Sequence, residues 1–304
     1  KEKSVLFVNR RGSGAFVLCR SCGTVPRCPR CTVSLASHGG EGLLRCHYCD
    51  YQTIVPQICA ECGSSEIHEY GVGTERVVEE VRAIIPQAHV VRMDSDTTTR
   101  VGDHARVLTE FEEAGDVLVG TQMVAKGLDF PTVTLAAVVA ADIGLNAPDF
   151  RASERAFSVI SQLCGRSGRA GPGEAIVQTF SPQHPAIVAA AAHDYERFAK
   201  GELDQRAATG FPPARRLVYL GVISRNSELA LSTARRYGEL LSGIAGTDVL
   251  GPAPYPIARL NREWRYRLAI ATLKPALVRA AIRERVLPHA RSDAHTRVAI
   301  NVDP

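Results

Sequence analysis

Residues 19–62 contain CRSC (19–22), CPRC (28–31), CHYC (46–49) and CAEC (59–62), four Cys-x-x-Cys pairs that use eight of the nine cysteines in the chain. Each pair can present two thiolates to one metal ion, and zinc takes four such ligands in a tetrahedron at about 2.3 Å. Disulfides are the alternative, but four repeats of one short spacing in a chain of cytosolic composition favour metal binding. Two structural zinc ions are therefore expected.

The spacing between the pairs also suggests which pairs share a metal. The two inner pairs are separated by 14 residues that include three glycines, close to the loop of common zinc ribbons. We therefore expect a nested arrangement, with cross-braced and sequential pairings as alternatives. His38 and His47 are not expected to be ligands. The first predicted zinc site contains Cys19, Cys22, Cys59 and Cys62, and the second contains Cys28, Cys31, Cys46 and Cys49.

On both sides of the cysteine-rich stretch, apolar runs alternate with amphipathic segments. This alternation predicts a parallel, doubly wound α/β sheet into which the cysteine-rich stretch is inserted. We expect a RecA-like lobe over 1–18 and 63–183 and a zinc-binding insertion over 19–62. Strands are predicted over 5–8, 88–93, 116–121, 133–141 and 174–180, and helices over 75–85, 104–114 and 153–164.

The last third of the chain has a different pattern. A helical connector is predicted over 184–212 and ends at the turn Gly-Phe-Pro-Pro (210–213). The remaining residues, 213–304, follow the order βαββαβ, which is typical of a ferredoxin-like α+β domain. Its strands are predicted over 217–224, 248–250, 265–272 and 296–302, and its helices over 227–245 and 276–287.

Positive charge is concentrated near the C-terminus. The net charge of the chain is +4, but residues 259–291 hold nine basic and two acidic side chains, a local charge of +7. Trp264 and Tyr266 alternate with Arg265 and Arg267, as in surfaces that bind single-stranded nucleic acid. We expect the arginine face, with Arg262, to be exposed and to contact phosphates, and the two aromatic residues to be partly core. An ordinary solvated face is the alternative.

The segment QLCGRSGR (162–169) carries two arginines on a glycine-rich turn after a predicted helix. Arg166 and Arg169 could neutralise the charge that develops on a transferred γ-phosphoryl group. Such a pair is often only a surface turn, but the full pattern Q-x-x-G-R-x-G-R in a doubly wound domain is more specific.

The segment GTQMVAKGLDFP (120–131) follows a predicted strand, where open α/β sheets bind ligands. Thr121 and Lys126 could contact a nucleic-acid backbone, and Asp129 a ribose hydroxyl. The sequence contains no GxxxxGK[ST] phosphate-binding loop. The chain alone is therefore not expected to hydrolyse ATP, and it begins within a strand, as a piece of a longer protein would.

These two segments resemble motifs V and VI of superfamily 2 helicases. Four Cys-x-x-Cys pairs inserted into a second RecA-like lobe resemble the PriA family of primosomal replication-restart helicases. The resemblance extends over the whole chain and supports nested zinc pairing; the one departure is Ser167, where family members often carry alanine. It also includes VGTER (72–76), PDFRASER (148–155), GFPP (210–213) and VLGPAPYPIARLNREWRYRLAI (249–270).

The resemblance implies an ATP- and Mg²⁺-dependent 3′→5′ DNA helicase that recognises abandoned replication forks. It implies forked and single-stranded DNA, single-stranded-DNA-binding protein and helicase-loading proteins as partners, with catalytic Arg166 and Arg169 and nucleotide contacts from Gln162, Gly127 and Asp129. We expect a cytoplasmic monomer without a membrane partner, because no apolar run approaches about 18 residues. A PriA relative without ATPase activity is the main alternative; a zinc-ribbon interaction module would leave both helicase motifs unexplained.

Overall fold

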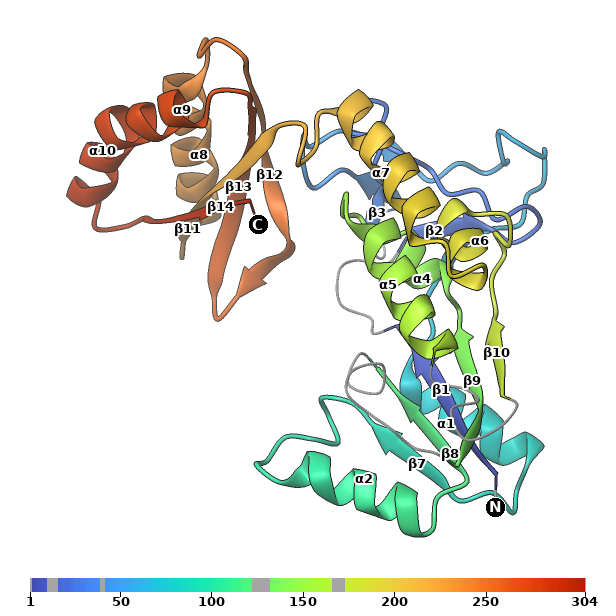
Figure 1. The fold of residues 1–304 in the computed structure, drawn as a ribbon. Coiled ribbons are helices and arrows are strands. Elements are labelled where there is room, and N and C mark those ends of the chain that lie inside the picture. Colours follow the sequence, from blue (N-terminus) through green and yellow to red (C-terminus); the bar gives the residue numbers. More distant parts are fainter. Residues whose placement is uncertain (1, 10–15, 39–41, 122–131, 166–172, 304) are drawn as a thin grey trace.

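A computed structural model describes residues 2–9, 16–38, 42–121, 132–165 and 173–303. Figure 1 shows a parallel sheet flanked by helices, a cysteine-rich module at one end of that sheet, and a C-terminal domain beyond the long helix α7 (Tyr195–Thr209). The sequence order of these parts is the predicted one.

The first sheet contains five parallel strands in the order β10-β9-β1-β8-β7. Its central strand, β1, is apolar toward both faces, with Val5 and Phe7 on one side and Val8 on the other, all buried. Burial on both faces is the rule for parallel sheets. The strands are β1 (Lys3–Val8), β7 (Val90–Met93), β8 (Val117–Gly120), β9 (Val133–Val139) and β10 (Glu174–Val177).

Helices cover both faces of this sheet. One core contains Phe7 of β1, Phe111 of α2 and Ile160 of α5, and a second core on the opposite face contains Val8 and Val77 of α1. The chain is therefore of the α/β class with a doubly wound parallel sheet, as the alternation of elements predicts. The helices are α1 (Thr74–Ile84), α2 (Asp103–Glu113), α4 (Asp142–Leu145), α5 (Ala152–Cys164) and α6 (Pro185–Ala191).

The segment predicted as a helical connector contains two helices. It consists of α6 and α7, because the chain turns at His193, whose φ is 53°. The Asp194 side chain then accepts a hydrogen bond from the backbone N–H of Arg197 and caps α7. The Phe198 ring stacks on that of Phe157 at 4.2 Å and fixes α7 against α5.

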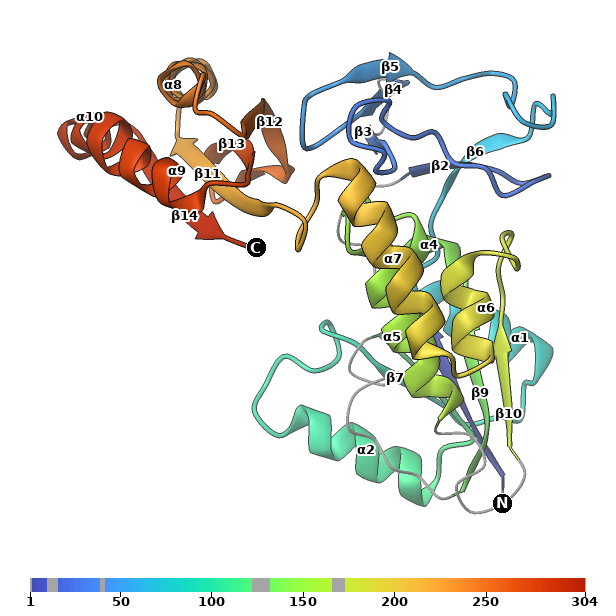
Figure 2. The same ribbon diagram turned by 45° about the horizontal axis from the view of Figure 1, so that its top comes forward.

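The cysteine-rich module contains two small antiparallel sheets (Figure 2). Strand β2 (Phe16–Cys19) pairs with β6 (Ile67–Tyr70), and these strands lie partly outside the predicted insertion over 19–62. The second sheet contains β3 (Ala36–His38), β4 (Leu43–Arg45) and β5 (Gln52–Ile54).

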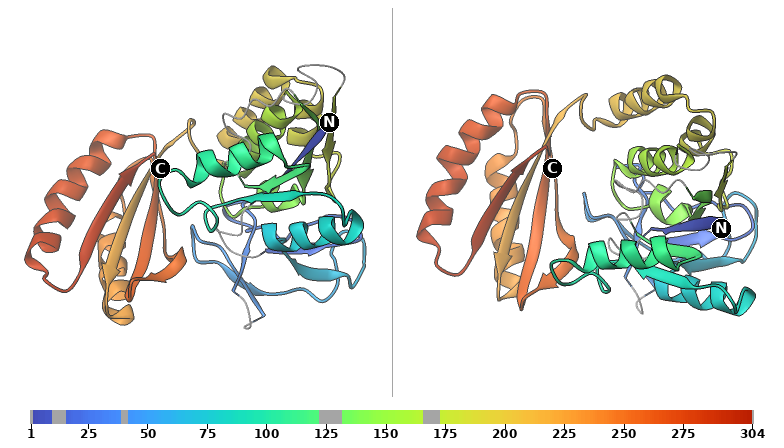
Figure 3. Two further views of the ribbon diagram at one scale, coloured as in Figure 1. Left: turned by 90° about the horizontal axis from the view of Figure 1, so that it is seen from below. Right: turned by 60° about the horizontal axis from the view of Figure 1, so that its bottom comes forward.

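The C-terminal domain has one antiparallel sheet in the order β12-β13-β11-β14, with its helices on one face (Figure 3). Its element order is βαββαβ as predicted, and its classification as ferredoxin-like stays a prediction. The elements are β11 (Arg216–Ser224), α8 (Ser227–Leu241), β12 (Thr247–Leu260), β13 (Glu263–Thr272), α9 (Pro275–Ala281), a π-helical turn (Ile282–Val286), α10 (Leu287–Ser292) and β14 (Arg297–Val302).

Strand β12 is much longer than the predicted segment 248–250. The prolines at 252, 254 and 256 lie in a strand at the edge of the sheet. An edge strand tolerates proline because one side of its backbone has no ladder partner. The pairing with β13 is irregular between Leu250 and Ala253 and between Pro254 and Arg259, where the prolines occur.

A carboxylate network closes the turn after β7 and supplies a testable prediction. The buried Asp94 side chain accepts hydrogen bonds from Thr74 Oγ1 (2.5 Å), Arg92 Nε (2.6 Å) and the backbone N–H of Asp96 (3.0 Å). Burial alone would raise the pKa of Asp94, but these bonds lower it from 3.8 to about 2.

Asp94→Asn should therefore lower the free energy of unfolding by about 2 kcal/mol at neutral pH. Because the folded-state pKa is depressed, this stabilisation is complete above the ordinary pKa and is lost as the pH falls from about 4 toward about 2. Urea unfolding of the two proteins across this range measures the difference. Asp96→Asn, at an exposed carboxylate of the same turn, is the control and should have little effect. An equal loss in both variants would contradict the prediction.

Candidate metal centres and nucleic-acid interface

The eight paired cysteines form two clusters in the nested arrangement predicted from the spacing. Within each cluster the four Sγ atoms lie within 4.8 Å of one another. Neither His38 nor His47 belongs to a cluster. The outer cluster contains Cys19, Cys22, Cys59 and Cys62, and the inner cluster contains Cys28, Cys31, Cys46 and Cys49.

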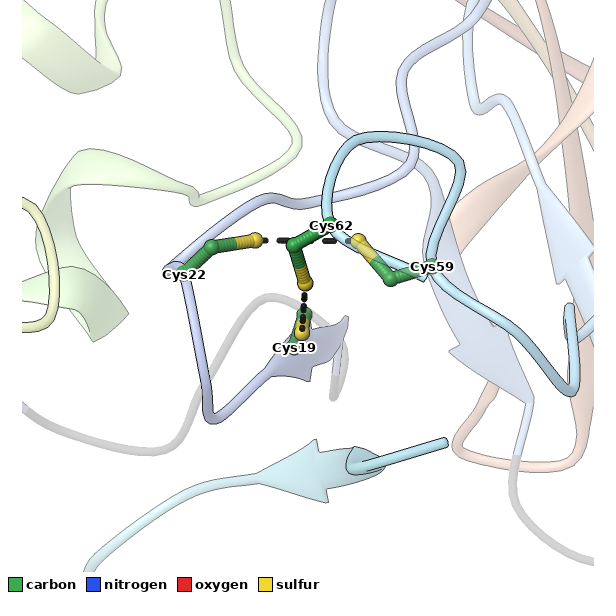
Figure 4. Close-up of side chains that lie close together, drawn as sticks. All are labelled: Cys19, Cys22, Cys59 and Cys62. Atoms are coloured by element: carbon green, nitrogen blue, oxygen red, sulfur yellow. Dashed lines mark hydrogen bonds between the residues drawn. The ribbon is translucent and has the colours of Figure 1, made fainter. Parts of the chain in front are cut away.

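The four sulfurs of the outer cluster converge from the end of β2 and from two loops (Figure 4). The Sγ atoms of Cys19 and Cys62 are 3.6 Å apart, as are those of Cys22 and Cys59. Four sulfurs bound to one zinc ion at about 2.3 Å form a tetrahedron with edges of about 3.8 Å. The cluster therefore fits zinc, which would crosslink the loop after β2 to the loop before β6.

All four Cys-x-x-Cys pairs share one backbone turn. In each, the residue after the second cysteine donates its N–H to the carbonyl of the first cysteine, at 2.8–3.0 Å. That residue has a left-handed φ, which costs little for glycine but is unfavourable for threonine. The sequence indicates this left-handed residue only in the two pairs that are followed by glycine. The four residues are Gly23 (77°), Thr32 (55°), Asp50 (64°) and Gly63 (71°).

The inner cluster is more buried than the outer cluster. Cys28, Cys31 and Cys46 are buried, and the Sγ atoms of Cys28 and Cys49 are 3.6 Å apart. A hydrogen bond with the Cys31 thiol lowers the pKa of Cys46 to about 5, and the same bond raises the pKa of Cys31 far above its ordinary value. Soft thiolate ligands at tetrahedral separation support a second structural zinc, whose bound form supplies a rigid crosslink and has no open coordination position.

Only some of the residues predicted to contact nucleotide or the nucleic-acid backbone fall within the described part of the chain. Thr121 follows β8 and is buried, and its backbone N–H donates to the carbonyl of Met93 at 3.3 Å. Gln162 lies in the last turn of α5, where its Nε2 donates to Ser158 Oγ at 3.2 Å. The predicted roles of these two residues stay predictions. Lys126, Gly127, Asp129, Arg166 and Arg169 lie outside the described residues.

The basic residues near the β12–β13 turn have unequal exposure. Arg262 is exposed in the turn itself. Arg265 is half-buried and donates through Nε to the carbonyl of Ile257 at 3.1 Å. Trp264 and Tyr266 are also half-buried, and Tyr266 packs against the core formed with α8, as expected.

The prediction that Arg267 is solvent-exposed is wrong. Its side chain does lie on the opposite face of β13 from Trp264 and Tyr266, but only 7% of the residue is exposed. The cysteine-rich module covers this face, and Arg267 Nε donates to the carbonyl of His47 at 3.2 Å. A phosphate therefore has no access to this guanidinium.

Three family models match consecutive parts of the chain. The Helicase conserved C-terminal domain matches residues 70–171, the PriA DNA helicase Cys-rich region domain matches 28–53, and the Primosomal protein N C-terminal domain matches 207–304. The match over 28–53 includes all four cysteines of the inner cluster. No helix among the described residues is long and apolar enough to cross a membrane.

Curated relatives match nearly the whole chain. Replication restart protein PriA of Bacillus subtilis is 41% identical over 310 residues, covering 100% of this chain and 38% of that protein. PriA of Treponema pallidum is 39% identical over 99% of this chain and 46% of its own length. PriA of Haemophilus influenzae is 34% identical over 99% and 42%. The chain thus spans less than half the length of these relatives.

A match to the helicase C-terminal domain, on a parallel sheet whose strand β1 is separated in sequence from the other strands by two four-cysteine clusters, defines a helicase lobe with a zinc-binding insertion. The matches to the PriA cysteine-rich region and to the primosomal protein N C-terminal domain narrow this class of helicase lobes to one family. The chain belongs to the PriA family of replication restart proteins.

Proposed function

We propose that this chain is the C-terminal part of an ATP-dependent 3′→5′ DNA helicase that restarts replication at abandoned forks. The observation that supports this most directly is the insertion of the two-cluster module between β1 and α1 of a helicase lobe. In this proposal residues 1–18 and 63–183 are the second RecA-like lobe, 19–62 the zinc insertion, 184–212 the connector, and 213–304 the C-terminal domain.

The full-length protein would bind ATP and Mg²⁺ between this lobe and a preceding lobe. Arg166 and Arg169 would face the γ-phosphate, and Gln162, Gly127 and Asp129 would contact the nucleotide. Thr121 and Lys126 would contact the DNA backbone. The chain alone should be inactive, because its sequence contains no phosphate-binding loop.

The proposed protein acts as a cytoplasmic monomer on forked and single-stranded DNA. It would bind single-stranded-DNA-binding protein and the proteins that reload the replicative helicase. The names of the PriA relatives support replication restart, and these partners extend that role.

An ATPase assay on the full-length protein with forked DNA tests this function. The expected result is DNA-stimulated hydrolysis together with displacement of a strand in the 3′→5′ direction, and no hydrolysis by residues 1–304 alone. Fork binding without hydrolysis would favour the second candidate, a PriA relative that acts only as a loading platform. The presence of both helicase motifs in the sequence favours the enzyme.

Of the three arginines predicted to contact phosphate, Arg262 in the turn between β12 and β13 is exposed and Arg265 is half-buried, so both remain candidates for DNA contact. Replacing Arg262 and Arg265 by alanine should flatten the slope of log affinity against log salt by about 1.4 units, because each phosphate contact with single-stranded DNA contributes about 0.7. Binding of this chain to single-stranded DNA at several salt concentrations measures the slope. The control replaces exposed Arg235 and Arg236 on α8, which removes equal charge from the helical side of the sheet. Equal slopes in wild type and in the Arg262/Arg265 variant would make this turn an ordinary solvated surface.

A further inference from the structure

The C-terminal sheet is covered on its two faces by different parts of the chain. Its helices cover the face that includes Leu220 and Leu268. The opposite face contributes Leu217 and Ala269 to a core shared with Tyr48 of the cysteine-rich module and with the inner-cluster cysteines. Figure 2 shows β12 and β13 beside the sheet of β3, β4 and β5. The inner cluster and the C-terminal domain therefore form one continuous apolar contact.

Arg267 lies at the centre of this contact. Its guanidinium carbon is 4.4 Å from the ring centroid of Tyr219, 5.3 Å from that of Tyr48 and 5.5 Å from that of Tyr255. Tyr219 and Tyr255 belong to the C-terminal sheet, whereas Tyr48 belongs to the module. A buried arginine that stacks on several rings is held more strongly than an exposed one, because desolvation strengthens the attraction between cation and ring.

Two glycines of the C-terminal sheet make room for this arrangement. Gly221 lies directly opposite Arg267 in the ladder, and a Cβ at Gly221 would be 2.3 Å from the Tyr255 hydroxyl. A Cβ at Gly251 would be 2.9 Å from the Arg267 carbonyl oxygen and 3.4 Å from that of Tyr48. The backbone is therefore shaped for close approach by the aromatic rings and by the module.

Two polar contacts between the module and the C-terminal domain come from a residue that lies between two expected zinc ligands. His47 and Tyr48 are the middle residues of the pair formed by Cys46 and Cys49. The His47 carbonyl accepts from Arg267, and His47 Nδ1 lies 3.0 Å from the Pro254 carbonyl oxygen. The Tyr48 backbone N–H is 3.4 Å from the Cys46 sulfur. A metal held by this pair therefore fixes the turn that the C-terminal domain contacts.

The inner-cluster turn also meets the helicase lobe at one point, where the Phe150 N–H donates to the Tyr48 hydroxyl at 3.4 Å, but the outer cluster contacts that lobe at a separate place. A Cβ at Gly23, which follows Cys22, would be 2.8 Å from the Phe180 carbonyl oxygen and 2.7 Å from Ser181 Oγ. The Tyr70 ring, on β6, meets the Phe180 ring at 5.5 Å. Phe180 and Ser181 follow β10 of the helicase lobe, so the outer cluster lies against that lobe.

We propose that the two zinc sites have different structural roles, each holding the module to a different part of the protein. The inner site fixes the Cys46–Cys49 turn as the docking point of the C-terminal domain, with Arg267 as the residue that holds it there. The outer site holds the module to the helicase lobe. The docking of the C-terminal domain on the module therefore depends on the inner metal and not on the outer one.

Arg267→Gln tests the docking residue, and Arg265→Gln is a matched control on the same face of the same strand. Arg265 also stacks on Tyr255, at 5.1 Å, and donates to the carbonyl of Ile257, so both of these contacts stay within the C-terminal domain. The readouts are trypsin cleavage after Arg215 and Arg216 and the maximum dimension from small-angle X-ray scattering. We expect Arg267→Gln to raise cleavage by about tenfold, equivalent to about 1.4 kcal/mol, and to lengthen the particle, with both zincs retained.

Arg267→Lys keeps the charge but not the planar stack, and should raise cleavage by a smaller factor. This lysine variant replaces the glutamine variant in the test if the glutamine variant loses zinc or secondary structure. Unchanged cleavage in a folded Arg267 variant, or an equal increase in Arg265→Gln, would overturn the proposal.

The division between the two metals is tested by Cys49→Ser and Cys62→Ser, one ligand from each cluster. Each variant should hold one zinc. Cys49→Ser should release the C-terminal domain, as measured by cleavage after Arg215 and Arg216 and by particle length, and Cys62→Ser should leave it docked. Release by both variants to the same extent, or by neither, would show that the inner metal does not set the position of this domain.

Discussion

Cys31→Ser should reduce bound zinc from two ions per chain to one and abolish the fold of the inner cluster. Cys31 is a buried member of that cluster, and a serine hydroxyl does not replace a thiolate as a soft ligand. Structural zinc contributes on the order of 10 kcal/mol in isolated zinc-binding peptides, and this free energy is part of the folding free energy. Metal analysis of protein purified without chelator, together with urea unfolding, measures both effects.

Cys164→Ala is the control for this prediction. Cys164 is the ninth cysteine, lies at the end of α5, packs against the core of the helicase lobe and belongs to neither cluster. The alanine variant should keep two zinc ions. Wild-type protein with one zinc or none, or loss of zinc in Cys164→Ala, would contradict the assignment of eight structural ligands.

Arg169→Ala in the full-length protein should lower kcat for ATP hydrolysis by about 10³-fold or more and leave DNA binding nearly intact. The physical reason is that an arginine opposite the γ-phosphate acts mainly on charge that develops in the transition state. Arg166→Ala should have a similar effect. Steady-state hydrolysis with saturating forked DNA measures kcat, and a separate titration measures DNA affinity, so the two assays distinguish a loss of kcat from a loss of DNA binding.

Arg155→Ala is the matched control, because Arg155 lies on α5 just before the motif and is exposed, with an ion pair to Asp149 at 2.9 Å. Its turnover should stay near the wild-type value. Wild-type turnover in the Arg166 or Arg169 variant would remove that arginine from the catalytic role.

The parts of the structure that could be predicted from the sequence are those set by local pattern. Apolar periodicity predicts the strands and helices of the parallel sheet, and the repeated two-residue spacing predicts the two cysteine clusters. The nested pairing also agrees, because the 14-residue loop with its glycines lets the inner pairs meet.

The parts that could not be predicted depend on contacts between distant segments. Alternation along β13 correctly separates Arg267 from Tyr266, but it cannot reveal that another module covers the arginine face. The long β12 was missed because local proline signals outweigh pairing, and only an edge position makes those prolines acceptable. Nothing in the local sequence indicates the docking role of Tyr48, except that an aromatic residue lies between two expected zinc ligands.

The location of the module between β1 and α1 has a consequence for the order of folding. The central strand β1 pairs with β8 and β9, so Val5 must meet Leu118 and Ala136 across the whole insertion. Closing a long flexible loop costs conformational entropy and slows the formation of distant contacts. The pairing of Phe16 with Tyr70 brings the two ends of the insertion together. The outer cluster joins the same two ends, because two of its cysteines lie at or just after the end of β2 and the other two lie just before β6. Zinc binding at the outer cluster would shorten the flexible loop that must close before β1 pairs with β8 and β9. The folding rate of the helicase lobe should therefore depend on the zinc concentration.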